Sequence, residues 1–199
     1  MIDLNSLTDE ELALRYVAGN NHAFDELLRR NQSQLFTYIL FVVRDRHVAD
    51  DVFQETFVRA ISKLQNNAYR ANGKFGAWLT RIAHNVMIDL FRSQKHKNII
   101  SIEDDTLTQL SARALLANNI EAECINAQVL TDVKRMVDLL PPVQREVVFM
   151  RFYQQMPFKE IAERTNVSIN TSLGRLHYAI RNLRKMARIY NISLQLAWS

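Results

Sequence analysis

The chain has 199 residues, 48% of them hydrophobic, and a formal net charge of +4 at pH 7, which suits one or two small domains with buried cores. Its single cysteine, Cys124, excludes an internal disulfide and a cysteine-built zinc site, and we expect no bound metal or cofactor. The acidic N-terminus and the lack of an extended apolar run argue against a signal peptide and direct membrane insertion, so we expect a cytoplasmic protein.

Helices are expected throughout, because only 4 glycines and 3 prolines interrupt the chain. Residues 7–30 predict two helices that separate at Gly19, and Thr8 and Glu11 form a capping box at the start of the first. Apolar residues become dense after Gln34, which predicts a further, largely buried helix. The sequence therefore predicts an all-α fold.

Charge alternates along the chain. Acidic residues outnumber basic ones in 1–55 and 98–125, whereas basic residues outnumber acidic ones in 56–97 and 126–199. Two basic blocks with an acidic block between them indicate two nucleic-acid contacts joined by a segment that avoids phosphates. Such blocks are also often no more than solvated faces.

Residues 47–64 have the period of an amphipathic helix. If its apolar side faces a core, the outward stripe is polar and rich in acid, with Asp50, Asp51, Gln54, Glu55 and Arg59. For most helices such a stripe is only a solvated face. Because the neighbouring blocks are basic, the alternative is that this stripe docks on a basic protein surface and stays away from nucleic acid.

A polar loop precedes the next helix. Residues 65–74 carry one aromatic and two cationic side chains, Tyr69, Arg70 and Lys74. A helix follows over 75–97, with Phe75 and Trp78 on its buried stripe. Polar and basic side chains lie largely off that stripe: Arg81, His84, Asn85, Arg92, Lys95 and Lys97. This combination is typical of a surface that binds an unpaired nucleic-acid strand.

Residues 98–118 lose the helical period and carry three adjacent acids. We interpret them as an acidic linker between two helical domains, 1–97 and 119–199. In the second domain, Pro141 and Pro142 open one short helix, another follows Pro157, and Ser168 caps a third. The last two helices and their tight turn form a helix-turn-helix, whose second helix normally enters the DNA major groove.

The last helix has two distinct faces. Its core side carries Ile169, Leu176, Ile180 and Leu183. The opposite face bears donors and small side chains but no acid, with Asn170, Thr171, Gly174, His177, Tyr178, Arg181 and Lys185. Such a face can lie against phosphates and base edges, which favours DNA binding over a purely structural three-helix core.

Three stretches in this order resemble the extracytoplasmic-function (ECF) group of bacterial RNA polymerase sigma factors: ADDVFQETFVRAISKL, FGAWLTRIAHNVMIDLFRSQK and LPPVQREVVFMRFYQQMPFKEIAERTNVSINTSLGRLHYAIRNLRK. The resemblance covers roughly residues 20–97 and 120–187. It implies a subunit without catalytic activity that directs core polymerase to promoters. Such factors are usually held inactive by an anti-sigma factor, so we expect one as a partner.

The resemblance also implies roles for residues of the first domain. The helix over 47–64 would dock on the clamp of the largest polymerase subunit through Asp50, Asp51, Gln54, Glu55 and Arg59. The loop and helix over 65–95 would melt the −10 promoter element and hold a flipped base. The candidates for that role are Tyr69, Arg70, Asn72, Lys74, Arg81, Asn85 and Arg92.

In the second domain, the resemblance implies that the last helix reads the −35 element as duplex DNA. The candidates are Asn170, Thr171, Gly174, Arg175, His177, Tyr178, Arg181 and Lys185. The chain departs from the family at Ser172 and Leu173, where an apolar residue and a cation are common. Docking on DNA should survive this departure, but the bases that are read do not follow from the family.

Two other classes of protein compete with this interpretation. A stand-alone helix-turn-helix regulator would account for the second domain. It would not account for the acidic helix over 47–64, the loop over 65–74 with its tyrosine, which we call the aromatic loop, or the acidic linker. An enzyme would need a site, and His47, Asp50 and Asp51 could share a helical face as metal ligands. Further ligands and a pocket are not evident from the sequence, so we disfavour an enzyme.

Overall fold

The structure is a computed structural model that describes residues 3–66, 68–70, 73–99 and 124–190. Every regular element within these residues is helical, which confirms the all-α prediction. None of the described helices is long and apolar enough to cross a membrane. The elements in chain order are η1 (Leu4–Ser6), α1 (Asp9–Val17), α2 (Asn21–Val43), α3 (Arg46–Gln65), α4 (Phe75–Ile99), α5 (Cys124–Asp138), α6 (Pro142–Val148), the π-helical η3 (Phe149–Tyr153), α7 (Phe158–Thr165) and α8 (Ile169–Ile189).

The ends of several helices follow the capping signals in the sequence. The capping box is present, since Thr8 Oγ1 accepts from the Glu11 amide and the Glu11 carboxylate accepts from the Thr8 amide. Ser168 caps α8 through the amide of Thr171. The predicted helix boundary before Gln34 is wrong, because α2 continues through it. No glycine or proline interrupts that stretch, so nothing ends the helix.

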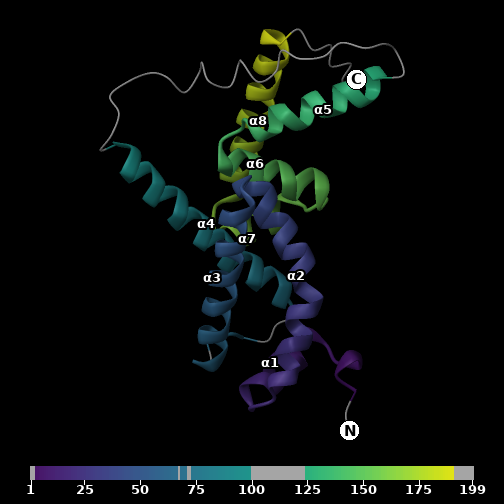
Figure 1. Ribbon diagram of the computed structural model, residues 1–199, viewed down its shortest axis with the longest axis vertical. Coiled ribbons are helices and arrows are strands. Elements are labelled where there is room, and N and C mark those ends of the chain that lie inside the picture. Colours follow the sequence, from purple (N-terminus) through teal and green to yellow (C-terminus); the bar gives the residue numbers. More distant parts are fainter. Residues whose placement is uncertain (1–2, 67, 71–72, 100–123, 191–199) are drawn as a thin grey trace.

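One apolar core joins both parts of the chain. Leu27, Ile39 and Leu79 from the first four helices belong to the same buried cluster as Met150 and Ile161 from η3 and α7. Figure 1 shows α6 and α7 lying against the bundle of α2, α3 and α4. We call this the closed arrangement. A smaller cluster packs α5 and α8 against α6 through Val137, Leu140, Val148 and Ala179.

The π-helical turn η3 brings aromatic side chains from the second domain against α2. The ring of Phe149 lies 4.7 Å from that of Phe41 and 5.9 Å from that of Tyr38, between ring centroids. Phe149 also stacks on Tyr153 at 5.6 Å. Aromatic pairs at these distances stabilise a contact beyond the area that they bury. Helical periodicity could not predict this contact, because the period of η3 is not that of an α-helix.

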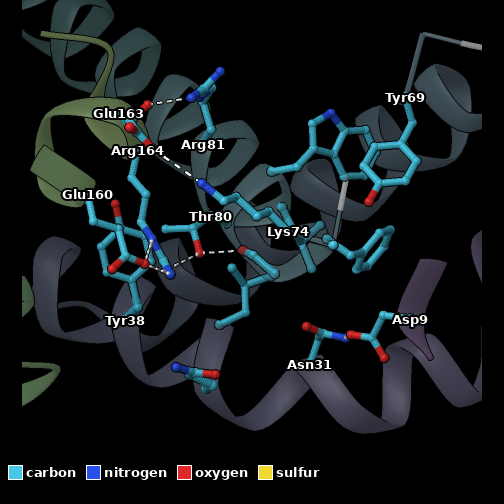
Figure 2. A pocket seen from close by; sticks show the side chains of 18 of the residues that line it. Asp9, Asn31, Tyr38, Tyr69, Lys74, Thr80, Arg81, Glu160, Glu163 and Arg164 are labelled. Atoms are coloured by element: carbon cyan, nitrogen blue, oxygen red, sulfur yellow. Dashed lines mark hydrogen bonds and ion pairs between the residues drawn. The ribbon is translucent and has the colours of Figure 1, made fainter. Parts of the chain in front are cut away.

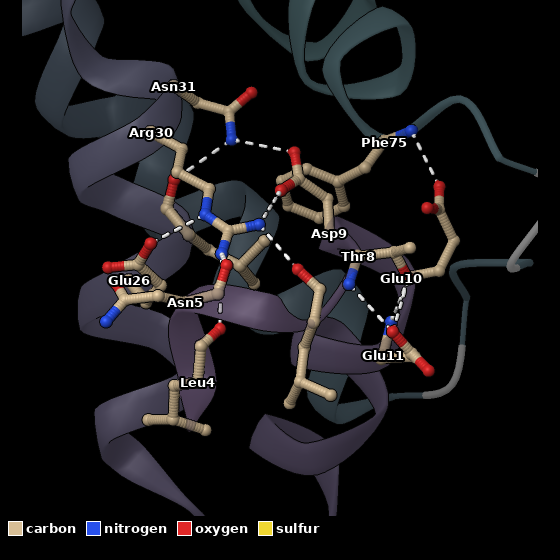
Figure 3. Close-up of polar contacts among 12 residues, drawn as sticks. Leu4, Asn5, Thr8, Asp9, Glu10, Glu11, Glu26, Arg30, Asn31 and Phe75 are labelled. Carbon is tan, nitrogen blue, oxygen red and sulfur yellow. Dashed lines mark hydrogen bonds and ion pairs between the residues drawn. The ribbon is translucent and has the colours of Figure 1, made fainter. Parts of the chain in front are cut away.

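Arg30 fixes the N-terminal segment to α2 (Figure 3). Its guanidinium donates to the Glu26 carboxylate at 2.6 Å and to the carbonyls of Leu7 at 2.7 Å and Asn5 at 3.0 Å. It also contacts Asp9 of α1 at 3.3 Å. These contacts hold α1 in a fixed position on α2, and α1 in turn reaches the loop before α4, as described below.

Glu26 should make the protein sensitive to acid. Hydrogen bonds from Arg29 and Arg30 lower the pKa of Glu26 from 4.5 to about 2. Because the folded state holds this carboxylate ionised, its contribution to stability is present above pH 4.5 and is lost as the pH falls towards 2. In Glu26→Gln, the free energy of unfolding should fall less steeply with pH in this window, as measured by urea unfolding at a series of pH values. Asp25→Asn, on the exposed neighbour, is the control and should leave the steep loss in place.

Candidate polymerase and promoter interfaces

The acidic stripe of the first domain lies along α3. Asp51, Gln54 and Glu55 are exposed, and Asp50 is half-buried. Arg59 differs from the others, because its guanidinium donates to Glu55 at 2.7 Å and to Asp89 of α4 at 3.2 Å. The stripe is thus an acidic surface, and Arg59 fixes it against α4.

The aromatic residue of the loop lies within a cluster. The Tyr69 ring is 4.7 Å from Trp78 and 5.5 Å from Phe75, between centroids. Phe75 is buried, as its position on the stripe predicts, and Trp78 is half-buried. Burial and a hydrogen bond to Glu10 raise the pKa of Tyr69, so its hydroxyl stays protonated and donates. Arg70 is exposed beside this cluster, and the predicted Asn72 lies outside the described residues.

A cleft of about 970 Å³ opens beside this cluster, between α1, α2, α4 and α7 (Figure 2). Three of the predicted −10 cations line it, Arg70, Lys74 and Arg81, and the last two contact the second domain. Lys74 Nζ is 3.8 Å from the Glu163 carboxylate, and Arg81 donates to the Glu163 carbonyl at 2.6 Å. Arg164 reaches back to Thr80 Oγ1 at 3.4 Å. In the closed arrangement, α7 therefore covers part of the predicted −10 surface.

A second cleft, of about 850 Å³, lies where α3 and α4 face the helix-turn-helix. Asn85 and Arg92, both predicted to act at −10, line it together with Arg175, which is predicted to act at −35. Arg59 lies at the same cleft. The closed arrangement therefore brings together residues from all three predicted interfaces, which sequence periodicity could not reveal.

A buried polar network holds the two domains together. The Glu146 carboxylate of α6 accepts from the Tyr38 hydroxyl of α2 and pairs with Nδ1 of His84 of α4 at 2.7 Å. The three residues are 2%, 1% and 5% exposed, respectively. Burial and the charge of Glu146 raise the pKa of Tyr38 well above its usual value. The predicted outward position of His84 is wrong, because its side chain is buried against Glu146 of α6.

An ion pair joins the domains at their edge. Arg44, at the end of α2, pairs with Asp138 at the end of α5. Close by, Arg145 is buried and donates to the Asp138 carbonyl at 3.0 Å. Burial and the nearby Arg44 lower the pKa of Arg145 to about 10, which leaves it charged at neutral pH. Sequence reasoning missed these residues and Glu146. The available signal was the pair of charged residues at 145–146, directly before the apolar run VVFM.

The outward face of α8 is largely as predicted. Most of the predicted −35 residues are exposed: Asn170, Thr171, His177, Tyr178, Arg181 and Lys185. Gly174 and Arg175 are half-buried. Leu173, where the family commonly has a cation, is 43% exposed. The face therefore offers cations at its C-terminal half and an apolar side chain near its N-terminus.

One prediction about the core side of α8 is wrong. Ile169 is 46% exposed, because the elements packed on α8 leave residues 168–171 exposed. Ser172 is instead 1% exposed, in the apolar position of the helix. Its hydroxyl oxygen has no hydrogen-bond partner among the described residues.

Models of known protein families match both halves of the chain. The model of Sigma-70 region 2 matches residues 27–97, and that of Sigma-70 region 4 matches residues 130–183. The chain is 26% identical over 175 residues to the ECF RNA polymerase sigma factor SigW of Bacillus subtilis, which covers 85% of this chain and 91% of SigW. It is 30% identical over 190 residues to the ECF RNA polymerase sigma factor BldN of Streptomyces coelicolor, which covers 94% of this chain and 67% of BldN.

The fold agrees with these matches. The structure of the sigma factor RpoE from Bartonella quintana, solved in complex with the anti-sigma factor NepR, superposes with a TM-score of 0.58. The identity is 19%, and the match covers 83% of this chain and 97% of RpoE. A stand-alone helix-turn-helix regulator would not account for the region 2 match. The chain therefore belongs to the ECF group of RNA polymerase sigma factors, as its three sequence stretches predicted.

Proposed function

We propose that this sigma factor is a cytoplasmic, non-catalytic subunit that binds core RNA polymerase and directs it to promoters. The observation that carries the proposal is that one chain presents three different surfaces. These are the acidic stripe of α3, the aromatic loop with the start of α4, and the outward face of α8. The functional domains would be 1–97 and 119–199, with 98–118 as the linker.

The acidic stripe of α3 would dock on the clamp of the largest polymerase subunit. Asp51 and Gln54 are free to meet basic groups on that surface, since both are exposed. Asp50 and Glu55 would add to the negative potential. Arg59 would act indirectly, because its contacts with Glu55 and Asp89 hold α3 and α4 together.

The aromatic loop and α4 would open the −10 element. Unstacking a base costs a few kcal/mol, which stacking on an aromatic side chain can offset. Tyr69 and Trp78 provide aromatic surface at the first cleft, with Arg70 and Lys74 beside it for phosphates. Arg81, Asn85 and Arg92 continue the polar surface along α4, and Asn72 is proposed here from its place in the loop.

Promoter binding would require the closed arrangement to open. The −10 and −35 elements lie about 25 base pairs apart, or about 85 Å along the duplex. In the closed arrangement, Asn85 of α4 and Arg175 of α8 line one cleft. One molecule can reach both elements only if α6, α7 and α8 move away from α2 and α4.

The outward face of α8 would bind the −35 duplex, with Arg181 on a phosphate. Arg181→Ala should then weaken binding of a −35 duplex, and the slope of log affinity against log salt should fall by about 1. Fluorescence anisotropy of a labelled duplex at several salt concentrations measures both quantities. Lys134→Ala removes an exposed cation from α5 and should change neither.

Reconstituted transcription tests the proposed function. The purified protein is added to core polymerase on a pool of genomic promoters, and the start sites are mapped. We expect initiation at a defined set of promoters that core polymerase alone does not use. Binding of duplex DNA without binding of core polymerase would overturn the proposal. An anti-sigma factor is the further partner that we propose, supported by the RpoE complex with NepR, and it should suppress this initiation.

A further inference from the structure

Helix α1 reaches the aromatic loop through one carboxylate oxygen. Glu10 Oε1 accepts a hydrogen bond from the Tyr69 hydroxyl at 3.1 Å and another from the Phe75 amide at 3.1 Å. Figure 3 shows the bond from the Phe75 amide to Glu10. Tyr69 lies in the loop before α4, and Phe75 is the first residue of α4. A single side chain thus links the loop to the start of the helix that follows.

The start of α4 needs such an acceptor. The first amides of a helix have no partner within the helix, and a side chain just before the helix often caps them. Here Lys74 precedes the helix and has no acceptor atom. Glu10 supplies the missing acceptor from another helix, and its negative charge is favourable at the positive end of the α4 dipole.

Glu10 is itself held on a rigid support. Its neighbour Asp9 contacts Arg30 at 3.3 Å and Asn31 at 3.1 Å, both on α2. On the other side, Glu11 closes the capping box of α1. The three successive acids therefore make different contacts. Asp9 anchors α1 on α2, Glu10 holds the loop, and Glu11 closes the capping box of its own helix. Of the three, only Asp9 fixes α1 to α2, and a fixed support of this kind keeps a functional group in position.

The two bonds to Glu10 hold the aromatic cluster at the cleft. Tyr69 lies 4.7 Å from Trp78, and Phe75 lies 5.4 Å from Trp78, between centroids. Glu10 is hydrogen-bonded to two members of this cluster, Tyr69 and Phe75. Its helix lies before residue 27, where the match to region 2 begins, so the region 2 model does not include it.

We propose that Glu10 is a positioning residue for opening of the −10 element, an inference that rests on the proposed function. By holding the Tyr69 hydroxyl and the Phe75 amide, it keeps the aromatic cluster in the orientation that receives an unpaired base. Helix α1 is then part of the promoter-opening surface, although no base or phosphate needs to touch it. Glu10 acts only through Tyr69 and Phe75.

The test compares Glu10→Ala, Glu10→Gln and Glu11→Ala in the full-length protein bound to core polymerase. Promoter opening is measured by the fluorescence of 2-aminopurine in the −10 element, and core binding by anisotropy. Glu10→Ala should lower the equilibrium constant for opening by about tenfold. Glu10→Gln retains an acceptor without the charge and should fall between Glu10→Ala and wild type. Glu11→Ala removes the Glu11 half of the capping box but keeps the Thr8 cap and every contact to the loop, so it should lower the melting temperature and leave opening unchanged.

Each outcome separates this inference from the proposed function. If the wild type fails to open promoters, the proposed function falls. If the wild type opens promoters and Glu10→Ala opens them equally well, the positioning role is overturned. Equal losses of opening in Glu10→Ala and Glu11→Ala would also overturn it, since they would reflect general loosening of α1.

Tyr69→Phe removes one of the two bonds, and in a double-mutant cycle with Glu10→Ala the losses should be less than additive. Strictly additive losses would contradict the proposed link.

Discussion

Replacing Glu146 with alanine is expected to separate the two domains. The substitution leaves the Tyr38 hydroxyl and Nδ1 of His84 without their partner inside a shared apolar core. Stranding buried polar groups in this way costs about 2–5 kcal/mol. Because the network crosses the domain boundary, the loss falls on the contact between the domains. The helices of each domain keep their own packing.

Small-angle scattering and circular dichroism measure these two effects separately. The radius of gyration of Glu146→Ala should increase while its helical signal is retained. Glu146→Gln keeps the shape and one acceptor oxygen, so it should give a smaller increase. Glu163→Ala is the matched control, because it removes a carboxylate from the same boundary that lies 3.8 Å from Lys74 and is largely exposed. A compact Glu146→Ala protein with wild-type stability would show that the network does not hold the domains together.

Reversing two charges on α3 is expected to weaken binding of core polymerase by about 10- to 100-fold. The substitutions are Asp51→Lys and Glu55→Lys, which place like charges opposite the basic surface that we propose as the docking site. The fold should remain intact, because both side chains are exposed. Glu55→Lys removes one contact of Arg59, but the bond from Arg59 to Asp89 of α4 remains. Titration of labelled protein with core polymerase measures the affinity, and the loss should shrink as the salt concentration rises.

The control for this experiment carries the same change in total charge at another place. The substitutions are Asp3→Lys and Asp25→Lys, at exposed positions outside α3. They should leave the affinity near that of the wild type. If the α3 variant binds as tightly as this control, the acidic stripe is only a solvated face.

Periodicity and capping signals predicted most individual helices. The capping box at Thr8, the helix start at Ser168 and the outward face of α8 all follow from local chemistry that the sequence displays directly. These features depend on residues within a few positions of each other. For the same reason, the sequence alone is enough to propose a promoter surface on the loop and α4.

The contacts between distant helices could not be predicted in this way. His84 lies among polar positions of α4 and looks solvent-facing, yet α6 buries it against Glu146. Ile169 has the right period for a core residue, yet it is 46% exposed, and Ser172 is the buried residue of the first turn. Periodicity tells which side of a helix is apolar, but it does not tell which other element covers each position. The link from Glu10 to Phe75 is of the same kind, since 65 residues separate the two.

The shared core also affects how tightly this sigma factor engages a promoter. If only an open form can reach both promoter elements, the observed dissociation constant equals the intrinsic one divided by the fraction of open molecules. Burial of Met150 and Ile161 among the first four helices stabilises the closed arrangement and so lowers that fraction. Every apolar contact across the boundary therefore lowers the apparent affinity for DNA without touching DNA. Affinity could then change through residues far from any nucleotide, while the bases that are recognised stay the same.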